Sequence, residues 1–569
     1  MARMPVMKYW LNWGELSGTP GTAEEFRALL SKYAREGLLI ACGRLTVEFN
    51  YGPEGKTVAR NPITKQFIPR LFSPELAAKV ELAFEHDRVI FFQGQLRYIA
   101  AEVTRLPSVG DLPEIENHEI GELLLRAAEI MTFQPPKPTD PMDALASKIA
   151  ELVPFYEIDT PTDAFDQLMR IYIMLTVNIP RLASKGPLLF DVAGEFEKVF
   201  GFSLADYTNF MFSLLLHAMT EREARQTNAD PPSPVGPYWL KMTTLSEETI
   251  HKVLATVSFS LDGLTPPKVP HGYADFTFLR DNPYLRYGEH YFCLDYEFAL
   301  GKLESGVIYR VLDNLEPGRK DPYLSFWGPV FEDYLAWLFE SYVSTKYSTY
   351  HSSPKYSDGT EVCDAIVICG GTAILIEAKI ATCNVVTKYS GDYVLMKKYL
   401  ESKLVGTPTK RKGVLQLTKA IENVKTKPPA FLPRCLAKVN KIIPLMVTKD
   451  EIGSSFVINT YLNERFESQF KRKDYLPLVV TPLVTMSAGS MERAMRPLAK
   501  VALSTILENR ITKDRQLGRP FEAASDYVFK GTARSLPKHM ELLTVAMDGL
   551  MKDFGMKEED GSQAKMAGD

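Results

Sequence analysis

Residues 363–379 read Cys-Asp-Ala-Ile-Val-Ile-Cys-Gly-Gly-Thr-Ala-Ile-Leu-Ile-Glu-Ala-Lys, two β-rich runs separated by Gly370 and Gly371. Two such runs joined by Gly-Gly predict a β-hairpin with a two-residue loop, because both central residues of a type I′ turn need positive φ. Counting back from this loop, Asp364 faces Glu377. Side chains directly opposite one another share a face of the sheet, about 5 Å apart at Cβ.

Strand alternation places Lys379 on the same face as Glu377. Both strands are apolar on both faces, which is typical of strands covered by helices on both sides; one face has Ala365, Val367, Ile374 and Ile376, and the other has Ile366, Ile368, Ala373 and Leu375. Two opposed carboxylates repel each other at the rim of such a sheet. A divalent cation would remove the repulsion, because Mg²⁺ commonly binds one or two carboxylates plus substrate phosphate. The alternative is a surface ion pair between Glu377 and Lys379, with Asp364 simply beginning a strand.

Asp364 together with Glu377-Ala378-Lys379 resembles the motif of the PD-(D/E)XK nuclease superfamily, which has the restriction-endonuclease-like fold. In that superfamily a helix carrying a Glu precedes the two strands. The predicted helix at 328–339 has a proline near its start and apolar residues at helical spacing, and it carries Glu332. The resemblance implies that Asp364, Glu377 and Glu332 bind Mg²⁺, or Mn²⁺ in its place, and that Lys379 stabilises the transition state. For Glu332 an ordinary solvated carboxylate is the alternative.

The predicted helix at 413–424 carries Gln416 beside an apolar stripe. Members of the superfamily related to recombination nucleases place a Gln in the helix that follows the Glu-x-Lys strand, so the resemblance implies that Gln416 is an auxiliary catalytic residue. Some of those members add a Tyr four residues later, where this chain has Ala420. Further strands are predicted at 442–448 and 478–486. The order helix, hairpin, helix, strand, strand fits the mixed sheet flanked by helices of this superfamily.

The segment between the Glu-x-Lys motif and Gln416 is strongly basic and contains interleaved tyrosines. Basic residues attract the phosphate backbone, and tyrosines stack on bases. We therefore expect six residues of this segment to bind nucleic acid, namely Lys388, Lys397, Lys398, Lys410, Arg411 and Lys412. A second basic cluster at 471–473 would extend the surface. The alternative is a solvated helix face with tyrosines in the core.

The composition limits the class of protein. A chain of 569 residues is expected to form two to four domains. The net charge of −4 argues against a protein that coats nucleic acid generally, so binding must come from a local patch. The six cysteines form no Cys-x-x-Cys pair and are expected to be free buried thiols, and no apolar run reaches the ~18 residues of a membrane span. With no secretory signal, these features predict a cytoplasmic protein without membrane contact.

Proline-rich stretches at 135–138 and 231–234 mark boundaries along the chain. We expect an α/β protein with a mixed α+β domain at 1–134, including strands at 89–92 and 96–99. A mainly helical domain at 141–318 would end in a hairpin at 287–295. The restriction-endonuclease-like domain, an α/β/α core with a mixed sheet, would cover 319–556, and 557–569 would be a disordered tail.

These features predict a metal-dependent endonuclease that cuts DNA, with RNA left open as a substrate. The first 318 residues carry no recognisable chemistry and would recognise a protein partner, regulate cutting or form a homo-oligomer. A large helical region joined to such a nuclease resembles effectors of bacterial anti-phage defence. The alternatives are a nuclease of DNA repair or recombination, and a non-catalytic nucleic-acid-binding scaffold that retains the nuclease fold.

Overall fold

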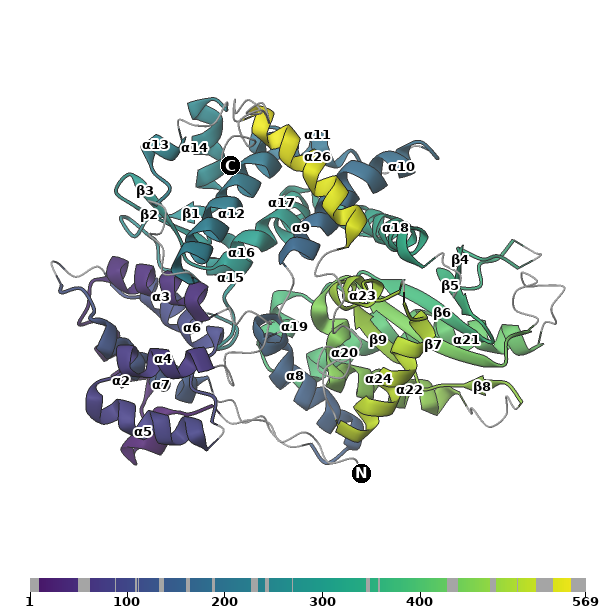
Figure 1. Cartoon of the computed structure of the whole chain (residues 1–569), viewed down its shortest axis with the longest axis horizontal. Coiled ribbons are helices and arrows are strands. Elements are labelled where there is room, and N and C mark those ends of the chain that lie inside the picture. The colour runs from purple at the N-terminus through teal and green to yellow at the C-terminus, as the bar shows by residue number, and fades with distance from the viewer. Residues whose placement is uncertain are drawn as a thin grey trace, which may run out of the picture.

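The protein is an α/β protein in which helices dominate the first half and a mixed sheet lies in the C-terminal half, which confirms the expected fold class (Figure 1). The computed structural model describes residues 10–49, 62–86, 88–107, 110, 112–131, 138–159, 164–186, 190–226, 234–240, 245–268, 270–343, 348–356, 359–426, 438–470, 477–498, 500–517 and 536–553. The predicted tail at 557–569 and the basic cluster at 471–473 lie outside these residues.

The described residues between 10 and 131 are mainly helical, where a mixed α+β domain was predicted. The helices are α1 (Trp13–Ser17), α2 (Ala23–Leu30), α3 (Arg35–Phe49), α4 (Pro62–Leu71), α5 (Pro74–Glu85), α6 (Gln93–Val103) and α7 (Asn117–Ile130). The strand predicted at 96–99 is wrong because these residues lie within α6. Every residue of α6 is buried, so its sequence lacks the alternation of a polar and an apolar helix face by which a helix is recognised. Of the strand predicted at 89–92, only Val89 pairs, in a single bridge with Trp10.

The middle of the chain is mainly helical, as predicted, and includes a small three-stranded sheet. The helices are α8 (Pro141–Asp159), α9 (Ala164–Ile173), α10 (Ile179–Ala183), α11 (Val192–Phe200), α12 (Leu204–Gln226), α13 (Pro237–Leu240), α14 (Glu247–Ala255), α15 (Thr277–Asp281), α16 (Tyr296–Gly301) and α17 (Val307–Asn314), with π-helical turns η2 (Met174–Asn178) and η3 (Lys302–Gly306). The expected hairpin is present as β2 (Tyr284–Tyr287) and β3 (His290–Cys293), with β1 (Ser258–Phe259) parallel to β2.

The C-terminal sheet has the order β4-β5-β6-β7-β8, and β9 also lies beside β7. Its strands are β4 (Thr349–Ser352), β5 (Ala365–Cys369), β6 (Thr372–Lys379), β7 (Lys441–Thr448), β8 (Val479–Val480) and β9 (Val484–Ser487). β4, β5 and β6 are antiparallel, whereas β7 is parallel to β6, β8 and β9. This is the mixed sheet that the sequence predicts.

The β5–β6 hairpin has the predicted register, with Cys369 opposite Thr372. The turn type differs from the expected type I′, because among its two central residues only Gly370 has positive φ, at 58°. Positive φ at the first central residue alone is the pattern of a type II′ turn. Both primed turns match the right-handed twist of the strands, so the register is the same.

Helices cover both faces of this sheet. The described helices in this part of the chain are α18 (Pro317–Tyr342), α19 (Val385–Tyr389), α20 (Tyr393–Leu400), α21 (Gly413–Thr426), α22 (Phe456–Gln469), α23 (Ala488–Met495), α24 (Leu503–Leu517) and α26 (Pro537–Asp553), with a π-helical turn η4 (Glu401–Val405) and a 3₁₀ turn η7 (Glu451–Ser454). Of these, α26 packs against α9 of the helical region instead of the sheet. The predicted division of the strands into two apolar faces is confirmed. One face packs in a core with α18 and α23, and the other packs with α20, α21 and α22.

Prolines affected two of the expected boundaries. The helix predicted to begin near Pro329 begins at Pro317 and continues through Pro329. The single strand predicted at 478–486 is divided at Pro482 into β8 and β9. The division lies beside Pro444 of β7, between its pairings with β8 and with β9. Proline has no N–H to donate to a neighbouring strand, so an interruption of the ladder at this place is expected.

Helix α8 lies with the C-terminal sheet, whereas the sequence suggested that it belongs to the helical region 141–318. Figure 1 shows it beside α20, and its buried residues Ala146, Ile149 and Val153 pack in the same core as Leu375 of β6. An ion pair between Asp143 and Lys397 of α20 joins the two helices. Local sequence patterns carry no information on this long-range packing.

A buried ionic network joins the helical region to the sheet. The guanidinium of Arg170 on α9 donates to both carboxylate oxygens of Glu492 on α23, at 2.6 and 2.9 Å, and to Glu304 at 3.2 Å. Glu304 also pairs with Lys449, directly after β7, at 3.2 Å. The hydroxyl of Tyr334 on α18 donates to Glu492 at 2.7 Å. These charged side chains are at most 5% exposed, so each depends on the others to remain ionised.

Five of the cysteines lie in the described part of the chain and are free thiols, three of them buried, while Cys435 lies outside it. Among the described helices, no single one has the length and apolar character to cross a membrane. One bent pair, Val192–Phe200 with Leu204–Ala218, meets that test by length and composition. Many side chains of this pair are buried in the protein core.

Candidate functional site

Asp364 and Glu377 lie side by side at the end of the β5–β6 hairpin. Ala365 and Ile376 are the last paired residues of these strands, so the next two residues outward, Asp364 and Glu377, are opposite one another. The Oδ2 of Asp364 accepts a hydrogen bond of 2.6 Å from the backbone N–H of Ala378. Asp364 is partly buried and Glu377 is 1% exposed. The structure therefore contains the juxtaposition of carboxylates that the sequence predicts.

The ammonium of Lys379 forms an ion pair with Oε1 of Glu377. This is the ion pair that the alternative interpretation expected, but it is not a surface pair, because Glu377 is buried. The side chain of Lys379 is 19% exposed, so its ammonium marks the boundary between the buried carboxylate and solvent. Lys379 is thus the direct partner of Glu377, and its charge also acts on Asp364.

All three predicted acidic residues have raised pKa values. Burial raises the pKa of Glu377 to about 8, against the effect of Lys379 and with a further contribution from Asp364. Burial also raises the pKa of Asp364, moderated by Lys379 and the Ala378 N–H. Desolvation, followed by repulsion from Asp364, raises the pKa of Glu332 to about 7. Three acids that resist ionisation together form a site that favours a cation.

Glu332 reaches this site from α18, on an exposed position of the helix. Water therefore screens its charge more than that of Glu377. The next residue, Asp333, points the other way and is buried against Asn178 and Arg181, to which it is bonded at 3.0 and 2.7 Å. Successive residues of a helix lie on different faces, so only Glu332 of this pair is available to the site.

A fourth carboxylate, Glu361, was not singled out from the sequence. Repulsion from Asp364 contributes, after burial, to its raised pKa, and Glu361 in turn acts on Glu332. It lies near Ser353, which has positive φ at 38° and is the non-glycine residue with this conformation among the described residues. The backbone N–H of Ser353 donates to the carbonyl of Asp364 at 2.9 Å. Backbone strain of this kind gathers at functional sites, but it cannot be read from a sequence.

A pocket of about 330 Å³ lies next to the carboxylates and shares Lys379 with them. Its lining consists of Lys379, Ile380, Ala381, Lys403, Arg411, Lys412 and Gln416. Gln416 accepts a hydrogen bond of 2.8 Å from the N–H of Gly413, at the start of α21. Its amide oxygen is thereby engaged, which leaves the amide nitrogen as the donor. The structure thus brings Gln416 to the site, together with a basic wall.

The six predicted nucleic-acid-binding residues divide into two groups. Arg411 and Lys412 line the pocket, and Lys410 lies close enough to Lys412 to lower the pKa of that lysine. The other three lie away from the pocket lining: Lys397 pairs with Asp143 of α8, Lys398 is exposed on α20, and Lys388 is half-buried with its ammonium 5.5 Å from the centre of the Tyr389 ring.

The interleaved tyrosines are core residues, as the alternative interpretation held. Tyr389 and Tyr399 are 4% and 7% exposed, and the hydroxyl of Tyr399 donates to the carbonyl of Ala381 at 2.8 Å. Tyr393 is half-buried. Stacking of bases on Tyr389 and Tyr399, which the sequence suggested, would require these residues to leave the core.

The donor set fits Mg²⁺. Asp364 and Glu377 offer the hard oxygen ligands that this ion prefers, and Glu332 is near enough for its charge to act on theirs. Within the described residues, no three His, Cys, Asp or Glu side chains lie close enough to hold a metal ion by themselves. Mg²⁺ keeps several waters and often takes substrate phosphate as a ligand, so two carboxylates beside an open basic pocket suffice for it.

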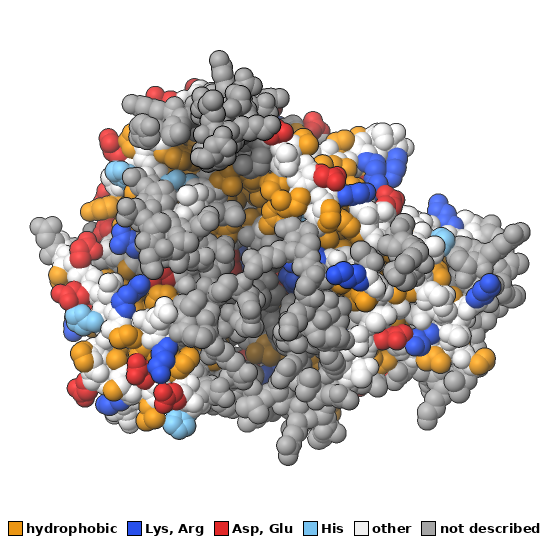
Figure 2. Space-filling model, in the orientation of Figure 1, with side chains coloured by type: hydrophobic (Ala, Val, Ile, Leu, Met, Phe, Trp, Pro, Cys, Tyr) orange, Lys and Arg blue, Asp and Glu red, His pale blue; other side chains and the backbone are white. Residues whose placement is uncertain are grey.

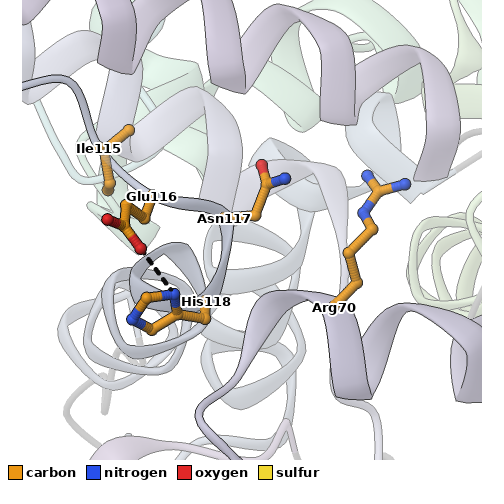
Figure 3. Close-up of a pocket in the computed structure, with 5 residues that line it drawn as sticks. All are labelled: Arg70, Ile115, Glu116, Asn117 and His118. Atoms are coloured by element: carbon orange, nitrogen blue, oxygen red, sulfur yellow. Dashed lines mark ion pairs between the residues drawn. The ribbon is translucent and has the colours of Figure 1, made fainter.

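A second depression, of about 480 Å³, lies at the start of α7 (Figure 3). Its lining residues are Arg70, Ile115, Glu116, Asn117 and His118, and Glu116 pairs with His118 at 3.2 Å. Both partners of this pair are more than half exposed, so the pair is weakened by solvent. This depression contains none of the carboxylates or cations described above.

Charges of both signs are intermixed over the N-terminal helices in the view of Figure 2. That face of the helical region therefore shows no extended basic surface. The site thus combines opposed buried carboxylates, a lysine between them and solvent, and a basic pocket. A scan against protein-family models, a search of curated proteins and a search of solved structures each give no significant match to this chain.

Proposed function

We propose that this protein is a Mg²⁺-dependent endonuclease that hydrolyses phosphodiester bonds in nucleic acid, with DNA as the favoured substrate and Mn²⁺ as an alternative metal. One observation carries the proposal. The opposed carboxylates Asp364 and Glu377 share Lys379 with a basic pocket. Acids that bind a hard cation, next to bases that bind phosphate, are what phosphodiester hydrolysis requires.

The order of elements around the site supports the same proposal. α18 precedes the sheet, β5 and β6 form the hairpin, α21 follows, and β7 returns parallel to β6. This is the order helix, hairpin, helix, strand on which the resemblance to the PD-(D/E)XK nucleases rests. The carboxylates Asp364 and Glu377, the lysine Lys379 and the helix residue Glu332 occupy the corresponding places.

The residues of the chain have distinct tasks in this proposal. Asp364, held by the N–H of Ala378, and Glu377 bind the cation, with Glu332 adjacent. When bound, Mg²⁺ lowers the pKa of its water and neutralises charge on the phosphate. The ammonium of Lys379 stabilises the negative charge that grows on the phosphoryl oxygens. Gln416, fixed through its oxygen by Gly413, donates its amide N–H toward the pocket.

We further propose that the helical first half controls this activity, as a regulated effector of bacterial anti-phage defence. The buried network around Arg170 and Glu304 connects that half to Lys449, directly after β7. Through these ion pairs, a change in the helical half would act on the sheet that carries the site. This part of the proposal otherwise rests on architecture alone. A repair or recombination nuclease would use the same site.

Cleavage assays with the purified full chain test the proposal. Plasmid, linear duplex, single-stranded DNA and RNA are incubated with Mg²⁺, Mn²⁺ or EDTA, alongside Asp364→Ala and the exposed control Asp262→Ala. We expect metal-dependent cleavage by the wild type and by Asp262→Ala, and none by Asp364→Ala. Cleavage that persists in Asp364→Ala contradicts the proposed site. An absence of cleavage from every substrate, both alone and with candidate partners, would favour the scaffold instead.

A further inference from the structure

The basic wall of the pocket beside Lys379 has no acidic counterpart. Within the described part of the chain, Lys403, Arg411 and Lys412 form no ion pair. The nearest acid in the same turn of chain, Glu401, faces elsewhere and is neutralised by Arg465, whose Nε donates to it at 2.6 Å. No carboxylate lines the pocket itself, so the repulsion among these cations destabilises the free protein and favours the binding of an anion.

The mutual repulsion of these cations is visible in Lys412. Burial lowers its pKa first, and Lys403, Lys410 and Lys379 lower it further. The lysines contributing to this effect come from η4, from the loop before α21 and from β6. Three separate elements thus direct ammonium groups at one place, which is not the arrangement of a solvated helix face.

The loop that supplies Arg411 and Lys412 is held in one shape. Thr407 and Lys410 exchange backbone hydrogen bonds of 3.0 and 3.1 Å, and Gly406 forms a bridge with Arg411. Gly406 and Gly413, at the two ends of the loop, have positive φ, at 92° and 41°. A Cβ at either position would collide with the backbone, at Lys412 in the first case and at Leu404 in the second. The cations are therefore positioned before any ligand arrives.

The size and chemistry of the pocket restrict its ligand. A volume of about 330 Å³ is at the low end for small-molecule sites, which begin near ~300 Å³. Arg411 offers a planar fork that matches a phosphate, and Lys403 and Lys412 offer point charges. Gln416 adds a neutral donor. A phosphate with part of its sugar fits these features, whereas a base has no aromatic partner among the lining residues.

We propose that this pocket binds a phosphate group of the nucleic-acid strand adjacent to the scissile phosphate, through Lys403, Arg411 and Lys412. The inference rests on the proposed function, because it places the scissile phosphate at the carboxylates Asp364 and Glu377. Lys379 lines the pocket and also pairs with Glu377, so it lies between the positions of the two phosphates. The phosphate in the pocket is either an internal phosphodiester or a terminal phosphomonoester, and both are phosphate anions that these cations would bind.

Binding without cleavage tests the pocket separately from the nuclease activity. Fluorescence anisotropy in EDTA measures the affinity of the wild type, Lys403→Ala and Arg411→Ala for short labelled DNA and RNA strands. Each strand is used with a 5′-phosphate and with a 5′-hydroxyl. The control is Lys419→Ala on the neighbouring helix α21, where Lys419 pairs with Glu422 at 3.3 Å and does not line the pocket. Each measurement is repeated over a series of salt concentrations.

We expect each pocket variant to bind about tenfold more weakly than the wild type, because a charged hydrogen bond to phosphate is lost. The slope of log Kd against the logarithm of the salt concentration should decrease by about one for each variant, because one phosphate contact is lost. A loss confined to 5′-phosphorylated strands assigns the pocket to a terminal phosphate, and an equal loss assigns it to an internal one. Pocket variants that bind like Lys419→Ala overturn the inference. If the wild type binds through the pocket but never cleaves, phosphate binding by the pocket stands and the proposed function fails.

Discussion

Replacing Glu377 with Gln should stabilise the protein in the absence of metal, by an amount that depends on pH. Glu377 has an ordinary pKa of 4.5, which is raised to about 8 in the folded state by burial. The folded protein therefore holds this proton at pH values where the unfolded chain has released it. Wild-type stability accordingly falls as pH rises above 4.5, and the fall ends above about 8. Gln has the same shape, carries no proton to lose, and can still accept a hydrogen bond from Lys379.

The size of the effect follows from the difference between the two pKa values. Each pKa unit corresponds to 1.36 kcal/mol. Glu377→Gln should thus gain ~1 kcal/mol over the wild type at pH 5, ~3 kcal/mol at pH 7 and close to ~5 kcal/mol at pH 9. The growth of this gain from pH 5 to pH 9 is the quantity to measure.

Urea denaturation in EDTA from pH 5 to pH 9 measures this trend. Amide hydrogen exchange in β6 identifies the transition that belongs to the C-terminal sheet. Glu422→Gln, a change at a partly exposed position on α21, is the control and should follow the wild type at every pH. Mg²⁺ at about a hundred times its Kd should stabilise the wild type by ~2.7 kcal/mol and leave Glu377→Gln unchanged. A stability difference that stays constant from pH 5 to pH 9 would refute the reasoning.

Three other substitutions test separate features. Lys379→Ala should reduce cleavage by about a hundredfold or more while titration calorimetry still detects Mg²⁺ binding, and cleavage at the wild-type rate excludes a role for this lysine. Gly413→Ala should lower stability in thermal unfolding by more than ~1 kcal/mol, because φ is positive there and a Cβ would meet Leu404. Gly318→Ala is the control and should be tolerated, because no atom lies within 4 Å of a Cβ at that position. Arg170→Met should lower the free energy of unfolding by ~3–5 kcal/mol, because Glu492 stays buried without its guanidinium partner. The double variant Arg170→Met with Glu492→Gln should recover part of this loss. A single variant as stable as the wild type would contradict the role of this ion pair.

The sheet could be predicted from the sequence because its signals are local. A Gly-Gly loop between two apolar runs sets the register of β5 and β6, and strand alternation then places Asp364 opposite Glu377. The helix carrying Gln416 has a clear apolar stripe, and β7 is a continuous apolar run. Each of these features depends on residues close together in the chain.

The features that the sequence did not predict depend on contacts between distant residues. α6 is buried on every side, so its apolar pattern has no helical period and resembles a strand. The packing of α8 against α20 has no local signal. Glu361 approaches Asp364 only because the chain bends after β4, at the strained Ser353. Lys388 and Lys397 looked like their basic neighbours in sequence, yet other parts of the fold draw them away from the pocket.

The position of α8 has a practical consequence for dissecting the protein. A truncated chain starting at residue 319 would lose the helix that packs on α20 and α22 in the core containing Leu375, and would expose the apolar surface of these helices to water. It would also lose Arg170 and Glu304, leaving Glu492 and Lys449 as buried charges without these partners. Such a fragment should aggregate during expression, and limited proteolysis between the two halves should release no stable C-terminal piece. The catalytic properties of the C-terminal half are therefore best measured in the intact chain.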